Sequence, residues 1–151
     1  MSTKKSLPVN RNQQYALFLK GIQLCGFGMQ DSRTTQDRGA YVALLSKDRL
    51  ARRISTEYNV MEVTKDSFNA SAKLSLTVED KANPASPAVL VECTYIAHFH
   101  CDGCEITKAL AERFTKSELR IVVWPYFRQF VNDATSRMAI QPIVIPFSAI
   151  S

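Results

Sequence analysis

Two neighbouring segments of alternating hydrophobicity constrain the fold of this chain most strongly. In the first, apolar residues fill the even positions from Phe68 to Val78, and polar residues fill the odd positions up to Glu79. In the second, the odd positions from Val89 to Cys101 are apolar or cysteine, and the even positions are partly apolar. A period of two predicts a long β-strand for each segment. Two prolines in residues 81–87 end the pairing between them, so we expect a turn there.

The preceding residues predict two further strands with lower regularity. Apolar residues alternate from Tyr15 to Met29 and change phase at Gly21, which indicates a strand with a bulge at that glycine. Residues 54–65 are rich in strand-forming types and predict the next strand. Residues 30–53 are expected to be a polar connection around an apolar cluster of uncertain structure, residues 41–45. Residues 1–12 have no apolar period and predict a loose arm before one domain of residues 13–151.

The period changes to that of a helix after the second alternating segment. Apolar residues recur at intervals of three and four between Leu119 and Met138, and the sequence Thr115-Lys-Ser-Glu118 has the form of a capping box. Pro125 either kinks this helix or lies in the first turn of its main part. We expect the helix aromatics (Tyr126, Phe127, Phe130) in the core, Arg128 and Arg137 in solvent, and an extended piece at residues 143–145. Strands followed by a helix predict an α+β fold, one antiparallel sheet with a helix on one face.

The net charge is divided unevenly along the 151 residues. The formal charge is +5, and 46% of the residues are hydrophobic, which is typical of a folded domain. Residues 1–53 carry ten Lys and Arg against three Asp, whereas residues 54–151 carry nine against eleven acidic residues. The densest basic run is Lys47 to Arg53. This run is either a solvated face or a surface for an anionic partner, so a nucleic-acid-binding regulator is an alternative function.

One cluster of residues has the types that bind metal. His98, His100, Cys101 and Cys104 are four potential Zn²⁺ ligands within seven residues. Structural zinc sites usually take their ligands from two elements, and no second pair of His or Cys ligands follows in the sequence. We therefore favour a turn at Asp102-Gly103, with the two cysteines packed as small apolar residues. A zinc site and a redox C-x-x-C remain alternatives. We expect no cofactor and no enzymatic activity, because no phosphate loop, nucleophile elbow or metalloprotease motif is present.

No compartment signal stands out in the sequence. No apolar run is long enough for a membrane span, and Lys20 and Gln23 interrupt the only stretch that resembles a secretion signal. The chain is large enough to build a core without a disulfide framework. We therefore expect a protein of the reducing cytoplasm that does not insert into membranes.

The segment from Trp124 to Ile145 resembles the helix of the protein-export chaperone SecB and its relatives. The shared features are an aromatic residue before Pro-Tyr, an Arg two residues later, a Ser/Thr-x-x-Arg helix end, and a Pro before an alternating apolar tail. Here they are Trp124, Pro125, Tyr126, Arg128, Arg137, Pro142, Ile143 and Ile145. Residues 19–25 look like the first strand of that family, so the resemblance extends from about Gln14 to Ile145.

This resemblance implies a four-stranded antiparallel sheet with a long helix on one face, assembled as a dimer of dimers. Such chaperones bind unfolded or aggregation-prone polypeptide in apolar grooves without ATP. The family includes general export chaperones and dedicated chaperones of toxin–antitoxin–chaperone systems. The chain ends at Ser151, before the second helix and acidic tail of the export chaperone, and its first third is basic. We therefore expect a dedicated role, in which the chain protects an antitoxin, meets the toxin only through that antitoxin, and does not dock to SecA.

The residues that contact a client are expected outside the elements needed for the core. The candidates from the second strand are Tyr58, Val60 and Met61, and those from the connection before it are Tyr41, Leu44 and Leu45. Ordinary burial is the alternative for each of them.

Overall fold

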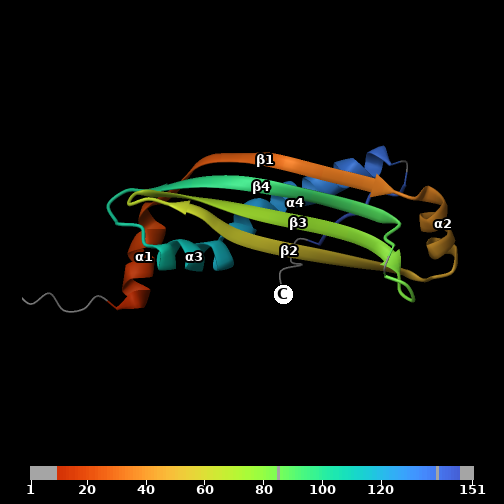
Figure 1. Ribbon diagram of the computed structural model, residues 1–151, viewed down its shortest axis with the longest axis horizontal. Coiled ribbons are helices and arrows are strands. Elements are labelled where there is room, and N and C mark those ends of the chain that lie inside the picture. The colour runs from red at the N-terminus through yellow and green to blue at the C-terminus, as the bar shows by residue number, and fades with distance from the viewer. Residues whose placement is uncertain (1–9, 85, 139, 147–151) are drawn as a thin grey trace, which may run out of the picture.

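The computed structural model describes residues 10–84, 86–138 and 140–146. A four-stranded antiparallel sheet has the order β1-β4-β3-β2, so β1 and β2 are its two edges (Figure 1). The strands are β1 (Ile22–Gln36), β2 (Leu50–Val63), β3 (Ser67–Asp80) and β4 (Val89–Cys101), and the helices are α1 (Arg11–Gly21), α2 (Arg38–Ser46), α3 (Lys108–Ser117) and α4 (Leu119–Arg137). The predicted α+β class, with a helix packed on one face of the sheet, is confirmed.

The two alternating segments are long strands, as predicted, and they form the centre of the sheet. Leu74 pairs with Cys93 in the β3–β4 register, and both side chains are fully buried. Their neighbours Ser75 and Glu92 pair on the opposite face, where they are partly exposed. Because side chains alternate along a strand, one sheet face is covered by helices, and the other is mostly polar, with Leu90 and Ile96 of β4 partly exposed on it.

A cluster of four phenylalanines joins the covered face to two of the helices. Phe68 of β3 stacks on Phe99 of β4 with ring centroids 5.0 Å apart. Phe114 of α3 meets Phe99 edge-on at 4.9 Å, and Phe18 of α1 meets Phe114 at 5.8 Å. Offset and edge-on geometries are the favourable ones for aromatic rings, so this cluster fixes α1 and α3 on the same sheet face.

The predicted strand from Tyr15 with a bulge at Gly21 is wrong, because its first half is helix α1. Tyr15 and Phe18, three residues apart, are buried, whereas Leu17 is 58% exposed. A Cβ atom on Gly21 would overlap the carbonyl oxygen of Asp102, so the end of α1 approaches the turn after β4 at a residue without a side chain. The bulges of β1 lie further on, at residues 24–26 and 29–31.

The region predicted as a polar connection also contains regular structure. Strand β1 continues to Gln36, and the apolar cluster at residues 41–45 lies in helix α2. The Asp37 side chain caps this helix by accepting a hydrogen bond from the Ala40 N–H.

Of the predicted N-terminal arm, residues 1–9 lie outside the described residues. Arg11 and Asn12 begin α1, and Asn10 caps it. The expectation of an arm is therefore wrong for residues 11 and 12.

The predicted capping box at Thr115 is also wrong. Thr115 lies inside α3, 2% exposed, and the residue that caps this helix is Thr107, whose Oγ1 accepts from the Leu110 N–H at 3.3 Å. Helix α4 begins at Leu119 without a side-chain cap, so Pro125 lies inside it and not in its first turn. None of the described helices is long and apolar enough to cross a membrane.

Candidate functional site

The helix residues that carry the sequence resemblance hold an extended segment, residues 141–146, against α4. Trp124 donates from Nε1 to the Pro146 carbonyl at 3.2 Å, and Arg128 donates from Nε to the Ile145 carbonyl at 2.9 Å. Thr135 accepts from the Ile143 N–H at 2.9 Å and donates to the Val131 carbonyl at 2.8 Å. Ile143 and Ile145 are each 2% exposed. These residues therefore have a structural role, and the expectation that Arg128 is solvated is wrong.

The remaining residues of that pattern lie at the surface. Pro125 and Pro142 are exposed, and Arg137 is exposed in the last turn of α4, where a cation is favourable to the helix dipole. Tyr126 is 51% exposed, so its expected place in the core is wrong. Its ring packs on Phe27 of β1 with centroids 4.4 Å apart, and Phe27 stacks on the buried Tyr95 at 5.1 Å.

This Tyr126 contact belongs to an exposed apolar surface beside the β1 edge. Leu24 and Met29 of β1, at 45% and 42% exposure, pair with the buried Phe99 and Tyr95 and so lie on the helix side of the sheet. With Phe27 and Tyr126 they form an apolar surface next to an edge strand of 15 residues. We call these four residues the β1 surface.

Two of the client candidates lie in a groove at the opposite edge. Tyr58 and Val60 of β2 pair with the buried Ala72 and Ala70, which places both side chains on the helix side, half-buried. They line a hollow of about 290 Å³ together with Asn59 and four residues of α3, namely Lys108, Glu112, Thr115 and Lys116. Met61 lies in the bulge between Val60 and Glu62 and is 57% exposed. We call this hollow and the helix side of β2 the β2–α3 groove.

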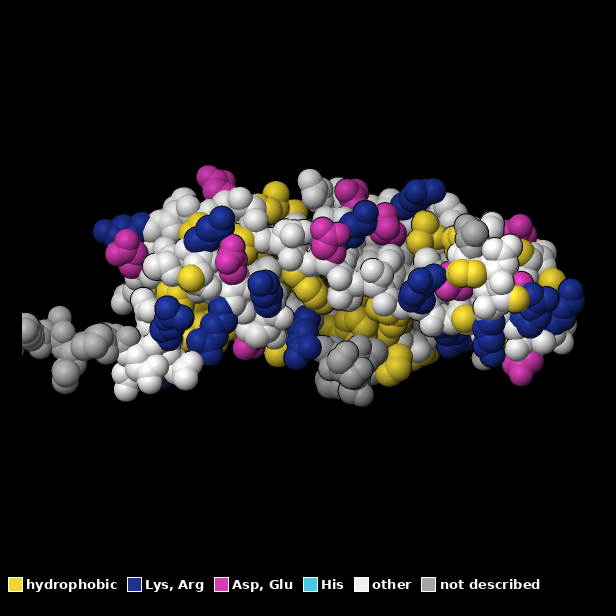
Figure 2. Space-filling view, turned by 60° about the horizontal axis from the view of Figure 1, so that its bottom comes forward, with side chains coloured by type: hydrophobic (Ala, Val, Ile, Leu, Met, Phe, Trp, Pro, Cys, Tyr) yellow, Lys and Arg dark blue, Asp and Glu magenta, His cyan; other side chains and the backbone are white. Residues whose placement is uncertain are grey.

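Half-buried apolar side chains continue along the helix side of β2. Leu50 and Ile54 point to the same side as Tyr58 and pack partly against the core, and exposed Arg52 and Thr56 lie between them. Figure 2, in which the β2 side comes forward, shows hydrophobic side chains open to solvent in the middle of this face, with Lys and Arg around them. Because β2 is an edge, the backbone groups on its outer side have no neighbouring strand within the described part of the chain.

The three α2 candidates do not join this groove. Tyr41 is 6% exposed and belongs to the core, Leu45 is 60% exposed, and Leu44 lines a separate hollow of about 290 Å³ with Ala40, Lys47 and Arg49. Eight residues of strand separate Leu50, near α2, from Tyr58, which is roughly 26 Å at the usual rise per residue. The sequence-based candidates are thus two separate groups at opposite ends of β2.

Two buried polar atoms beside the groove have no hydrogen-bond partner in the described part of the chain. They are the Thr115 Oγ1 and the Arg120 Nε. Arg120 is near enough to Tyr58 to act on its hydroxyl group. Burial raises the pKa of Tyr58, while a hydrogen bond with Thr56 and the positive charge of Arg120 oppose that rise. Sequence reasoning missed the whole α3 wall, although Leu110, Ala111 and Phe114 have helical spacing.

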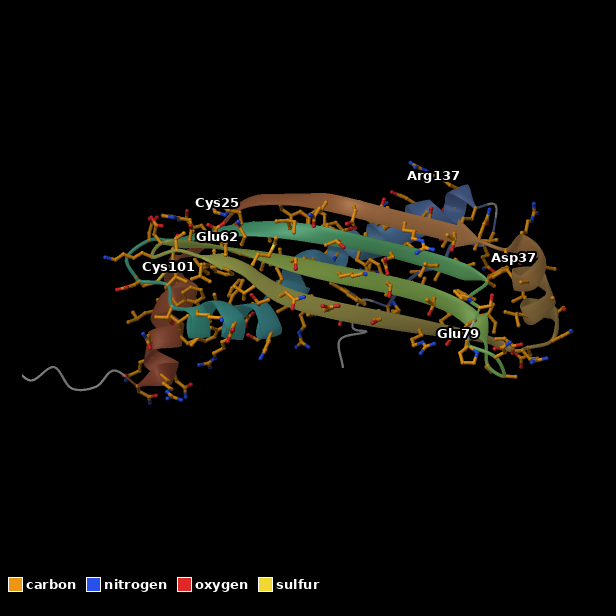
Figure 3. The ribbon with its side chains drawn as sticks, in the orientation of Figure 1. Cys25, Asp37, Glu62, Glu79, Cys101 and Arg137 are labelled. Atoms are coloured by element: carbon orange, nitrogen blue, oxygen red, sulfur yellow. A yellow bond between two sulfur atoms is a disulfide. The ribbon has the colours of Figure 1, made fainter. Side chains whose placement is uncertain are left out.

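The His/Cys cluster forms a disulfide-closed turn. Cys101 and Cys104 are bonded to each other, so the expectation that they pack as separate small apolar residues is wrong. The predicted Asp102-Gly103 turn is confirmed, and Gly103 has a φ of 79°. Figure 3 places Cys101 at the end of the sheet beside α1 and α3.

The two histidines of that cluster contact other side chains. His98 Nδ1 lies against Asn69 Oδ1, and His100 Nε2 is 3.0 Å from Asp102 Oδ1. Among the described residues, no three His, Cys, Asp or Glu side chains are grouped so that they could hold a metal ion.

The other two cysteines occupy different environments. Cys25 is exposed, whereas Cys93 is buried in the core. Burial raises the pKa of the Cys93 thiol to about 11, and it raises the pKa of the neighbouring Tyr95 hydroxyl as well. A buried thiol with a raised pKa is protonated near neutral pH and is therefore a poor nucleophile.

The basic run between α2 and β2 is partly paired. Arg49 forms a two-bond pair with Asp80, with Nη2 to Oδ2 at 2.8 Å, and Arg53 pairs with Glu79, which is 7% exposed. These arginines join the edge strand β2 to β3. The run is therefore less available to an anionic partner than its sequence suggests.

Comparison with known proteins identifies the fold. The Mycobacterium tuberculosis Rv1957 SecB-like chaperone, in complex with a ChAD peptide from the Rv1956 HigA1 antitoxin, superposes with a TM-score of 0.74 over 89% of this chain and 96% of that chain, at 17% identity. The chain has the SecB-like fold.

The remaining comparisons add no further argument. A protein of unknown function from Streptococcus agalactiae is matched at a TM-score of 0.48 and 8% identity, over 83% of this chain and 97% of that chain. No protein-family model and no curated protein sequence matches the chain. At 17% identity the likeness to the mycobacterial chaperone establishes the SecB-like fold, and the functional argument has to come from the surfaces of this chain.

Proposed function

We propose that this chain is an ATP-independent chaperone that binds extended, unfolded polypeptide in the β2–α3 groove. The observation that carries the proposal is the groove itself, in which half-buried apolar side chains follow a strand of 14 residues that is an edge of the sheet in the described part of the chain. An extended segment can pair with the edge backbone and place alternate side chains against Ile54, Tyr58 and Val60. Backbone pairing requires little of the client sequence, which suits a chaperone.

We further propose that the client is an antitoxin and that the chain acts in the cytoplasm, with the toxin reached through the antitoxin. The structural neighbour was determined with an antitoxin peptide bound, which supports this role over general export. The basic first third of the chain disfavours docking to SecA. Binding of nucleic acid is the alternative of another class, and the pairing of Arg49 and Arg53 with β3 weighs against it.

A homo-oligomer, such as a dimer of dimers, completes the proposal. The β1 surface combines exposed Leu24, Met29 and Tyr126 with a second unpaired edge strand. Edge strands of this length are usually covered in native proteins, because they pair readily with other chains. A second copy that pairs at β1 would bury this surface and leave the β2–α3 groove open for client.

The test measures binding of an antitoxin peptide and suppression of client aggregation by three variants with matched exposure. Met61, Leu45 and Leu17 are 57%, 60% and 58% exposed and lie in the β2 bulge next to Val60, on α2 and on α1, respectively. We expect Met61→Asp to weaken both activities about tenfold, because a carboxylate opposes apolar burial. Leu17→Asp should leave both unchanged, since none of the residues that line the hollow belongs to α1.

The Leu45→Asp variant separates the two groups of candidates. If it abolishes binding while Met61→Asp does not, the client site lies on α2 and the groove assignment is wrong. Wild-type protein that neither binds an antitoxin peptide nor suppresses aggregation would overturn the chaperone function itself. Salt-sensitive binding of an oligonucleotide in its place would support the nucleic-acid alternative.

A further inference from the structure

We propose that the β2–α3 groove contains a subsite for a carboxylate of the bound polypeptide, formed by Thr115 and Arg120 with Lys108 and Lys116 around it. The inference rests on the proposed function and adds a chemical preference to it. Apolar grooves alone do not discriminate between clients of equal hydrophobicity. A charged subsite would favour segments with an acidic residue at one position.

The unpartnered atoms are the first observation. Thr115 is 2% exposed and lines the hollow, and its Oγ1 has no hydrogen-bond partner among the described residues. The Arg120 Nε is also buried without a partner among them; Arg120 does not line the hollow, but its charge acts on Tyr58, which does. Buried polar groups in native proteins are nearly always paired, so one donor in the hollow and a second close to it leave places for the acceptor atoms of a ligand.

The charges around the hollow indicate that the ligand is an anion. Lys108 and Lys116 line it, and the positive charge of Arg120 reaches Tyr58 on its opposite wall. Glu112 is the acidic residue in the same lining, so cations exceed anions there. A carboxylate accepts hydrogen bonds from both an arginine N–H and a threonine hydroxyl, and a charged acceptor strengthens each bond.

The groove also accounts for why the carboxylate belongs to a polypeptide. The hollow of about 290 Å³ includes Tyr58 and Val60 of β2 in its wall. A segment paired to the β2 edge would place one side chain in two toward α3. The carboxylate is then either an Asp or Glu side chain or the C-terminus of the client, and the two sources are distinguished by experiment.

The experiment uses the full chain and four synthetic peptides measured by fluorescence anisotropy at fixed salt. Each peptide alternates apolar and serine residues over ten positions and carries one central Glu or its isostere Gln. Each of these two is made with a free and with an amidated C-terminus. We expect wild-type protein to bind the Glu peptide about fivefold more tightly than the Gln peptide, the preference of a half-buried charge pair.

Four variants test which residues produce the preference for the Glu peptide over the Gln peptide. Arg120→Gln should remove it and Thr115→Val should reduce it, each judged by the ratio of the affinities of the same variant for the Glu and the Gln peptide. Glu112→Gln should increase it, because a competing negative charge is lost. Lys73→Gln removes a positive charge from the opposite sheet face, where Lys73 pairs with Glu92, and should leave the preference intact.

Each outcome decides between the subsite and the groove. Equal affinity of wild type for all four peptides would overturn the subsite and leave the chaperone function standing. A preference that follows the free C-terminus in place of Glu would support the subsite and assign it to client termini. A preference that persists in Arg120→Gln would overturn the assignment to these residues. No binding of any peptide would overturn the proposed function together with the subsite.

Discussion

Similar polar side chains are hydrogen-bonded in one region of the molecule and unpartnered in another. Along α4, Trp124, Arg128 and Thr135 all hydrogen-bond to the extended segment 141–146. Near the β2–α3 groove, Thr115 of α3 and Arg120 of α4 present buried donors that have no hydrogen-bond partner in the described part of the chain. A hydrogen-bonded polar group stabilises the fold, whereas a buried polar group without a partner costs stability until a ligand or water supplies one. The contrast distinguishes the structural side of the molecule from its binding side.

Loss of Trp124 should produce the largest effect. It is 4% exposed, packs near Phe127 and holds Pro146, so Trp124→Ala should lower the free energy of unfolding by about 3–5 kcal/mol. Ile121→Ala, on the same helix at 58% exposure, should cost less than about 0.5 kcal/mol. Urea unfolding monitored by circular dichroism measures both. A loss below 1 kcal/mol, as a rough limit, for the tryptophan variant would show that the segment is not held as described.

Two threonine substitutions compare a hydrogen-bonded hydroxyl with an unpartnered one directly, with smaller expected changes in the free energy of unfolding. Thr135→Val leaves the buried Ile143 N–H without its acceptor and should cost about 1–3 kcal/mol. Thr115→Val removes a hydroxyl that has no partner and should change stability by less than about 0.5 kcal/mol, or increase it. The same urea titrations apply. Equal losses for both variants would remove the distinction between the segment held by α4 and the groove beside α3.

Reduction of the Cys101–Cys104 bond should have the smallest effect. The bond closes a loop of only four residues, for which chain entropy allows at most about 2 kcal/mol. The turn is also held by the Ile106 N–H on the Lys65 carbonyl at 2.8 Å. Thermal unfolding with and without reductant, and of Cys104→Ser, should therefore show a shift of a few degrees. Unfolding at room temperature on reduction would contradict this expectation and make the turn essential to α1 and α3.

The sequence predicted those parts of the fold whose burial follows one period. Strands β3 and β4 alternate because one face is fully buried, and α4 repeats at three and four because it packs along one side. Helix α1 was mistaken for a strand because Leu17 and Leu19 alternate with Tyr15, although both leucines point to solvent. A short helix attached by two aromatic residues has too few buried positions to show its period.

The candidate site was predicted only on its β2 side. Tyr58, Val60 and Met61 were accessible to sequence reasoning as apolar residues not needed for the core. The α3 wall was not predicted, because Thr115 and Glu118 have the spacing of a capping box. The true neighbours of Thr115 are set by the phenylalanine cluster that docks α3. The unpartnered state of Thr115 and Arg120 depends on three-dimensional packing, which no local pattern encodes.

Amide hydrogen exchange with and without a bound antitoxin peptide tests the central claim most directly. We expect the peptide to slow exchange at the outer edge of β2, residues 50–63, and in α3, while the amides of α2 and β1 keep their rates. Protection confined to β1 or α2, with β2 and α3 unchanged, would contradict binding in the β2–α3 groove.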